Sequence, residues 1–438
     1  MGAEPWARMW GMRPSQPTLD QDGERSIDGD GLLRLLFVVP FGPRFDSKHG
    51  GRVIAQLLRQ LAGRHEVAVV YQRLPHSAPM DEMLGSSCAL VRQVPLVPAA
   101  PLGPQWQHQQ RVMKTLINGR PTPVSAIYSR HFARIVRQLA QEWKPDVIQI
   151  EHDLLGYCIP ELDMPESATV LVCHDPGLKA AKDLVAVTHG RRRLAHRLDV
   201  MAWRRYWART LTRADAVVTF TEEDARSITD VAAVRRIVAI PLGIDLPAQP
   251  SDAAGVAPPR IVFIGGYVHP PNADAALRLM RSIMPAARRA MPDLQLTLVG
   301  ERPTSSMWRA ASADDEITGG VPSVAPYVDN AALIVLPIRL GGGMRVKLLE
   351  ALAAGKAVIA SPLAAAGLHV KDGEQLRIVE TDEQFARTIL ELLDDEELRR
   401  GLGARARAWA LENLGWDRRV ALYEDLYRTL VETTRDRI

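Results

Sequence analysis

Short runs of apolar residues alternate with segments of helical spacing along most of the chain, and proline, glycine or polar residues bound each run. Residues 32–39 form the first run, which contains one arginine and ends at a proline. A helical pattern then opens at Gly50 and Gly51, and residues 66–70 form the next run. A short continuous apolar run is typical of a parallel strand that is buried on both faces. The order of strand, glycine loop, helix and strand therefore predicts a βαβ unit.

The alternation continues in two series, separated by residues 246–259, which are rich in Pro, Ala, Gly and Ser and typical of a linker. Further strands are expected at 146–150, 169–173, 216–220 and 238–241 in the first series, and at 260–264, 294–299, 332–337 and 357–360 in the second. Helices of the second series are expected at 273–290, 345–354 and 383–395.

These patterns predict an α/β chain of two doubly wound domains. The first domain is expected at 31–245 and the second at 260–415, with an aperiodic tail at 1–30 and a last helical segment at 416–438. Ligands of open parallel sheets bind beyond the carboxyl ends of the strands, so we expect the site in a cleft between the two domains.

Composition narrows the class of protein further. The 438 residues carry 54 Lys and Arg against 51 Asp and Glu, a formal net charge of +3, which argues against a dedicated nucleic-acid binder. The three cysteines, Cys88, Cys158 and Cys173, are widely spaced, which excludes a disulfide scaffold and favours a reducing compartment. No run approaches the about 18 apolar residues of a membrane span, and residues 1–30 lack the apolar core of a signal peptide. We therefore expect a cytoplasmic enzyme.

The segment at 337–368 carries the most chemical information. Gly341, Gly342 and Gly343 follow an expected strand, and a helix is expected to begin near Met344. A helix N-terminus after glycines presents free N–H groups and a partial positive charge that suit a diphosphate. Arg345 and Lys347 would add formal charge there, and Glu350 would accept hydrogen bonds from a diol such as ribose. These residues together indicate a nucleotide site, although a triple glycine is also typical of a plain loop.

This segment resembles the donor-binding region of glycosyltransferase family 4, whose members have the GT-B fold of two Rossmann-like domains facing a central cleft. The sequence from Glu350 to Gly355 matches the second half of the family's signature, in which two glutamates stand eight positions apart. The first glutamate would fall at Gly342, which departs from the signature. The resemblance covers roughly residues 32–430. It implies that Glu350 binds the ribose of a nucleotide-sugar of UDP or GDP type, and that the helix at 416–438 packs back on the first domain.

Other segments fit the same family. Gly265 and Gly266 stand where the family has a glycine loop after the first strand of its second domain, and Gly50 and Gly51 resemble a loop that touches the donor phosphates. The family's Arg and Lys after the second-domain loop are missing, so we expect Arg345 and Lys347 to supply that charge. The candidate catalytic residues are Glu151 and His152, which follow a strand of the first domain, together with Arg345 and Lys347 of the second domain. His174 follows the next strand of the first domain and is a candidate donor-binding residue.

The resemblance implies a hexosyltransferase-type enzyme of polysaccharide biosynthesis that transfers a sugar to a saccharide or lipid-linked acceptor, with retention at the anomeric carbon and without a metal or other cofactor. In strict register the family histidine falls on Glu151 and His152 is one step later, so the catalytic role is open between them. His152 and His174 are equally compatible with structural histidines. A GT-B epimerase or phosphorylase, or a nucleotide-sugar binder without activity, is an alternative.

Residues Arg191–Arg213 contain eight arginines interleaved with large apolar residues at helical spacing. One interpretation is a peripheral contact with an anionic membrane surface, at the inner face of the membrane. An ordinary packed helix with a solvated basic face is the interpretation that we favour. The oligomeric state is open.

Overall fold

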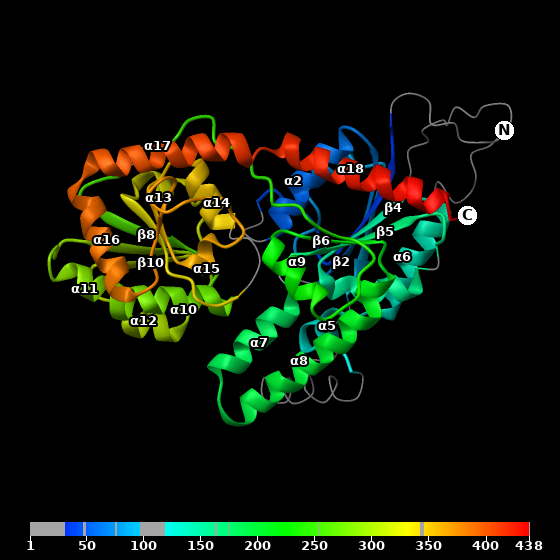
Figure 1. The fold of residues 1–438 in the computed structure, drawn as a ribbon, viewed down its shortest axis with the longest axis horizontal. Helices are drawn as coiled ribbons and strands as arrows, with labels where there is room; N and C mark the ends of the chain where they lie inside the picture. The colour runs from blue at the N-terminus through cyan, green and yellow to red at the C-terminus, as the bar shows by residue number, and fades with distance from the viewer. Residues whose placement is uncertain are drawn as a thin grey trace. The chain divides into compact units, whose positions relative to one another are not determined.

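The computed structural model describes residues 31–46, 50–74, 77–96, 119–162, 164–174, 176–252, 254–341 and 346–437. The described residues form two compact units (Figure 1). The first unit contains those up to Thr219, together with 224–240 and 420–437, and the second contains 220–223 and 241–419. Each unit is built around its own parallel sheet with helices packed against it.

The first unit holds a seven-stranded sheet in the order β3-β2-β1-β4-β5-β6-β7, and all paired strands are parallel. The strands are β1 (Arg34–Val39), β2 (Glu66–Arg73), β3 (Leu90–Pro95), β4 (Val147–Glu151), β5 (Ala168–Cys173), β6 (Ala216–Thr219) and β7 (Ile237–Ala239). The central strands β1, β4 and β5 consist almost wholly of buried residues, as expected of strands that are covered on both faces.

The helices of the first unit pack on the faces of this sheet. They are α2 (Gly50–Ala62), α3 (Glu82–Ser86), α5 (Thr122–Ile127), α6 (Arg130–Trp143), η1 (Asp153–Glu161), α7 (Gly177–Val187), α8 (Gly190–Thr210), η2 (Leu211–Arg213), α9 (Glu222–Thr229) and, from Val420 on, α18 (Trp416–Arg435). On one face, residues of α6, η1 and α8 share a hydrophobic cluster with Ile148 and Ile150 of β4. Trp203 and Trp207 of α8 are fully buried there.

The C-terminal helix α18 is tied to the first unit by polar contacts as well as by apolar packing. The carboxylate of Glu424 lies 3.2 Å from Nε2 of the buried His65. Tyr427, which is fully buried, donates a hydrogen bond from its hydroxyl to Gln149 of β4 at 2.5 Å. The last helix is therefore part of the first unit's structure and reaches a central strand of its sheet.

The second unit holds a six-stranded parallel sheet in the order β10-β9-β8-β11-β12-β13. Its strands are β8 (Arg260–Ile264), β9 (Gln295–Val299), β10 (Asp315–Gly319), β11 (Leu333–Leu336), β12 (Val358–Ala360) and β13 (Arg377–Ile378). Its helices are α10 (Pro270–Arg278), the π-helix η3 (Leu279–Ile283), α11 (Met284–Arg288), α12 (Ser305–Ala310), α13 (Ala325–Asn330), α14 (Val346–Ala353), α15 (Pro362–Ala365), α16 (Asp382–Asp394) and α17 (Glu396–Asn413).

The two doubly wound parallel sheets predicted from the sequence are confirmed. Every strand that the apolar runs predicted is present, with ends that differ by at most three residues. Three strands were not predicted, namely β3, β10 and β13, and all three are edge strands. Within the described parts of the chain, no helix combines the length and hydropathy that crossing a bilayer requires.

Candidate active site

The carboxyl ends of β1, β4 and β5 lie at one edge of the first unit's sheet, because neighbouring strands in this sheet are parallel. Glu151 is the last residue of β4 and His152 follows it, while His174 follows the last residue of β5. The register places Glu151 opposite Val172, so these three candidate residues lie at neighbouring positions on the same edge of the sheet. The sequence-predicted residues Glu151, His152 and His174 therefore form one group, which we call the acceptor-side cluster.

Glu151 lies at the buried bottom of the acceptor-side cluster. Its side chain is 1% exposed, and one carboxylate oxygen lies 2.5 Å from Nε2 of His174, whose side chain is 9% exposed. The other oxygen accepts a hydrogen bond from Nε2 of Gln149 at 2.6 Å. Both carboxylate oxygens thus have partners, and the imidazole of His174 is the more accessible of the two groups.

His152 lies against His174 in the same cluster. The two rings are stacked with centroids 4.0 Å apart, and Phe41 meets the ring of His152 edge-on at 5.8 Å. Burial, and then the neighbouring His174, lower the pKa of His152 well below its usual 6.5, so this ring is neutral at pH 7. Its Nε2 atom is buried and has no hydrogen-bond partner among the described residues. The backbone at His152 has a φ of 72°, a conformation that residues other than glycine rarely adopt.

The N-terminus of α2 lies beside both histidine rings. A Cβ atom added at Gly50 would stand 3.6 Å from Nε2 of His152 and 3.6 Å from Nδ1 of His174. The first turn of α2 contains no acidic residue that would offset the partial positive charge of a helix N-terminus. Gly50 and Gly51 therefore bring a helix N-terminus, a common site for anions, to the acceptor-side cluster.

In the second unit, Gly265 and Gly266 follow β8 and lie close to the end of β9. A Cβ added at Gly300, where φ is +148°, would stand 1.9 Å from the carbonyl oxygen of Gly265, so only glycine fits at this crossing. Gly265 in turn leaves no room for a side chain beside Asn272, whose Nδ2 donates a hydrogen bond to the carbonyl of Gly266 at 3.0 Å.

Lys347, near the start of α14, is connected to this glycine loop. Its Nζ donates a hydrogen bond to Oδ1 of Asn272 at 2.5 Å and lies 4.9 Å from the centre of the Phe263 ring. Asn272 therefore joins Lys347 to Gly266, and the positive charge stands next to the loop where the sequence predicted a need for it. Glu350 follows one turn later on α14 and is half-buried. We call Gly265, Gly266, Lys347 and Glu350 the donor-side group.

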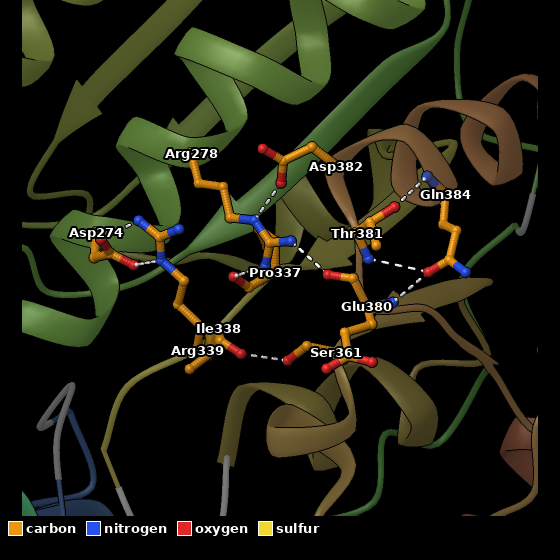
Figure 2. A network of polar contacts seen from close by, with 10 residues as sticks. All are labelled: Asp274, Arg278, Pro337, Ile338, Arg339, Ser361, Glu380, Thr381, Asp382 and Gln384. Atoms are coloured by element: carbon orange, nitrogen blue, oxygen red, sulfur yellow. Dashed lines mark hydrogen bonds and ion pairs between the residues drawn. The ribbon is translucent and has the colours of Figure 1, made fainter. Parts of the chain in front are cut away.

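A network of polar contacts fixes the strand end that leads into the triple glycine (Figure 2). Arg278 donates hydrogen bonds to the carbonyl of Pro337 at 3.1 Å and to the carbonyl of Glu380 at 2.6 Å, and it pairs with Asp382 at 2.5 Å. Arg339 pairs with Asp274 through two nitrogens, at 2.8 and 2.9 Å. Gly341 is described and has a φ of 90°, whereas Gly342, Gly343, Met344 and Arg345 lie outside the described residues.

Lys356, which follows the family signature, is fully buried and serves the structure of the second unit. Its Nζ donates hydrogen bonds to the carbonyls of Asp329 at 2.8 Å and Ala331 at 2.7 Å, and also to that of Asp252. Burial lowers the pKa of this ammonium to about 8. The lysine thereby joins the segment before β8 to the segment before β11.

Four residues that surround the two groups were not predicted from the sequence: Phe41, Gln149, Asn272 and Tyr427. Asn272 was visible as the end of the run after Gly266, but nothing in the sequence connected it to Lys347. Gln149 was visible only as a polar residue inside an apolar run, and Tyr427 only as one apolar position of an amphipathic helix. Their contacts depend on the fold.

Two family models match the chain. A model of glycosyltransferase family 4 matches residues 50–247, and a model of glycosyl transferases group 1 matches residues 258–395. Among curated proteins, an uncharacterized glycosyltransferase of Methanocaldococcus jannaschii is 33% identical over 93 residues, or 21% of this chain and 24% of its own length. The phosphatidyl-myo-inositol mannosyltransferase of Mycolicibacterium smegmatis is 28% identical over 180 residues, or 39% of this chain and 46% of its own length. The chain thus spans less than half the length of these two relatives.

Solved structures share the fold at low sequence identity. A sucrose-phosphate synthase from Thermosynechococcus elongatus has a TM-score of 0.68 and 18% identity, over 91% of this chain and 100% of that chain. Anabaena HepE in complex with UDP and glucose has a TM-score of 0.64 and 14% identity, over 91% of this chain and 100% of that chain.

Two parallel α/β units, each with glycine loops and charged side chains at the carboxyl ends of its strands, define a protein of the GT-B fold. One family model matches most of the first unit and the other matches most of the second. The chain therefore belongs to the glycosyltransferases that resemble family 4.

Proposed function

We propose that this protein transfers a sugar from a nucleoside diphosphate, of UDP or GDP type, to a hydroxyl of a saccharide or lipid-linked acceptor. The observation that carries the proposal is the placement of Lys347, which Asn272 holds against the glycine loop at the carboxyl end of the second sheet. The match to glycosyl transferases group 1 over the same unit supports it. So do neighbours of the same fold that were solved with UDP, glucose and UDP-glucose.

The donor-side group suits a diphosphate leaving group. Breaking the bond between sugar and diphosphate develops negative charge on the β-phosphate oxygens. A cation that is already held in place stabilises this charge without reorganising, which lowers the barrier more than it strengthens ground-state binding. Lys347 supplies that charge, and Glu350 on the same helix accepts hydrogen bonds from the ribose diol. We propose, from the resemblance to family 4, that transfer retains the anomeric configuration and requires no metal.

The acceptor-side cluster suits the other half of the reaction. The acceptor hydroxyl must be oriented, and it must lose its proton as the new bond forms. His174 is the accessible base of this cluster, while Glu151 lies behind it and holds the ring through Nε2. His152 packs against the same ring and is neutral at pH 7, so it contributes shape rather than charge.

Nucleotide binding tests the proposed donor site. Melting temperatures are measured with UDP, GDP, ADP and dTDP for the wild type, for Glu350→Ala and for the matched surface control Glu412→Ala. A nucleotide at 100 times its Kd adds about 2.7 kcal/mol to the free energy of unfolding. We expect one nucleotide to stabilise the wild type and the control, and to lose most of this effect in Glu350→Ala. Equal stabilisation of all three proteins would contradict the role of Glu350. A nucleotide that binds while its sugar conjugate is neither transferred nor hydrolysed would favour a binding protein without activity.

As a second and separate proposal, residues 191–213 make a peripheral membrane contact, which the sequence alone did not favour over an ordinary packed helix. All eight arginines of this segment are exposed, and Leu194 and Met201 on the same helix are 59% and 50% exposed, while Trp203 and Trp207 face the core. Exposed apolar residues flanked by arginines suit an interface with anionic lipid. We expect the protein to sediment with vesicles that contain phosphatidylglycerol, and less with pure phosphatidylcholine. The double variant Arg204→Glu and Arg205→Glu should lose this binding, and equal sedimentation of both proteins would reject the contact.

A further inference from the structure

A chain of buried polar side chains runs from the C-terminal helix to the acceptor-side cluster. The hydroxyl of Tyr427 on α18 donates to Oε1 of Gln149 at 2.5 Å, and Nε2 of Gln149 donates to Glu151 at 2.6 Å. The second oxygen of Glu151 pairs with His174 at 2.5 Å. Three consecutive contacts therefore connect a residue near the end of the chain to the imidazole of the proposed site.

In this series of hydrogen bonds, each contact determines which atom of the next residue donates and which accepts. Because Oε1 of Gln149 accepts from Tyr427, the amide group turns its NH₂ side toward Glu151. The Glu151 carboxylate then receives one donor at each oxygen and has a single orientation. With Nε2 of His174 directed at Glu151, the other ring nitrogen, Nδ1, lies on the side of the α2 N-terminus, near Gly50.

The alternation of β4 explains how these side chains reach α18. Ile148 and Ile150 point into the hydrophobic cluster shared with α6 and α8. Gln149 and Glu151 stand two residues apart and therefore project from the opposite face of the sheet. Tyr427 belongs to the C-terminal helix, which contacts this face.

Packing alone does not explain why residues 149, 151 and 427 are polar. Gln149 and Glu151 are each 1% exposed and Tyr427 is fully buried. Apolar side chains of similar volume would fill the same space without a desolvation cost, and such replacements are often neutral or stabilising. A fully hydrogen-bonded buried network does, however, give its members one rigid arrangement. Its outer member, His174, is the one that the described structure leaves partly accessible.

We propose that Gln149 and Tyr427 are positioning residues, which lock the Glu151 carboxylate and, through it, orient the imidazole of His174 toward the acceptor. This inference rests on the proposed function of the acceptor-side cluster. It gives the C-terminal helix a role in the reaction in addition to its role in packing. The variant Tyr427→Phe removes one oxygen and keeps the ring, so it isolates this role from packing.

A double-mutant cycle tests the proposal. Release of nucleoside diphosphate from UDP-glucose and GDP-mannose is measured for the wild type, Tyr427→Phe, His174→Asn and the double variant. We expect Tyr427→Phe to lower kcat about tenfold in the wild type and less than twofold in the His174→Asn background. Tyr423→Phe is the matched control, because Tyr423 is buried one turn earlier on the same helix, and it should leave kcat within twofold of the wild type. An equal loss in both backgrounds would overturn the proposal.

A second measurement tests the positioning without turnover. The ¹⁵N chemical shifts of the His174 ring report which nitrogen carries the proton. We expect the Nε2–H form in the wild type and in Tyr423→Phe, and a mixture of the two forms in Tyr427→Phe. The same spectrum for Tyr427→Phe and wild type would refute the positioning role. If the spectra are as expected but the wild type shows no turnover, the proposed transfer reaction is rejected. The positioning of His174 by the buried hydrogen-bonded residues is then still supported.

Discussion

The acceptor-side cluster and the donor-side group are built in different ways, although both lie at the carboxyl ends of parallel strands. The acceptor-side cluster depends on buried side chains from β4, β5 and α18 that are distant in sequence. The donor-side group depends on glycines that allow close backbone approach and on one helix that carries Lys347 and Glu350. Under the proposed function, this difference indicates that binding a charged, extended ligand needs mainly backbone and fixed charge, whereas moving a proton needs a side chain held in one orientation.

The largest expected effect is on turnover and comes from the acceptor-side cluster. His174→Ala should lower kcat by about 10²–10³-fold, because the proposed base is lost. Nucleotide binding should remain within twofold of the wild type, since the donor-side group is intact. Steady-state rates and calorimetric titration with UDP and GDP check the two halves of this prediction. If His174→Ala lost nucleotide binding as well as turnover, the separate roles proposed for the acceptor-side cluster and the donor-side group would be contradicted.

The next effect is on folding and comes from the glycine crossing in the second unit. Gly300→Ala should lower the free energy of unfolding by roughly 3 kcal/mol, because the new Cβ overlaps the carbonyl of Gly265 and φ is positive. Gly319→Ala is the control, since φ is also positive there and a Cβ meets no atom within 4 Å. Urea denaturation compares the two variants. Equal stabilities would show that the crossing relaxes easily and that Gly300 is not required for this loop.

A smaller effect is expected on donor affinity. Lys347→Ala should weaken nucleoside diphosphate binding about tenfold, which corresponds to about 1.4 kcal/mol. Lys371→Ala serves as the control, because that side chain is 75% exposed and pairs only with a surface glutamate among the described residues. Calorimetric titration of both variants is the measurement. Unchanged affinity in Lys347→Ala would assign the diphosphate charge to other groups.

The smallest effect concerns pH and His152. Its pKa is lowered in the folded protein, so below about pH 6.5 the unfolded chain binds a proton that the folded chain does not, and stability falls as the pH falls. His174 and, behind it, Glu151 face this ring, and the same groups remain in His152→Asn. The variant should therefore lose fewer degrees of Tm than the wild type between pH 7.5 and 5. His131→Gln, at an exposed histidine, should follow the wild type, and parallel curves for all three proteins would show that His152 does not titrate in this way.

The sequence predicted the fold well because buried parallel strands leave continuous apolar runs, and it missed strands that do not. The edge strand β3 contains Arg92 and Gln93 and ends in a proline, and β10 begins with Asp315 and Glu316. An edge strand pairs on one side only, so its residues need not be apolar. Strand β13 has two residues, too few for any pattern.

The candidate site was predictable where its residues are close together in the sequence. Lys347 and Glu350 stand on one helix after a glycine run between a strand and that helix, and from this whole pattern the sequence predicted contacts with a phosphate and a diol. Gln149 and Tyr427 are 278 positions apart, and neither has a pattern that connects it to chemistry. Their contact requires the C-terminal helix to lie on one face of β4, which only the assembled first unit determines.

The division of roles between the two groups is tested most directly by one set of titrations. UDP and GDP are titrated into the wild type, His174→Ala and Lys347→Ala, and release of nucleoside diphosphate from UDP-glucose and GDP-mannose is measured on the same samples. We predict that His174→Ala binds the nucleotide within twofold of the wild type and has lost turnover, while Lys347→Ala binds it about tenfold more weakly. Normal binding by Lys347→Ala with lost binding by His174→Ala would contradict the account.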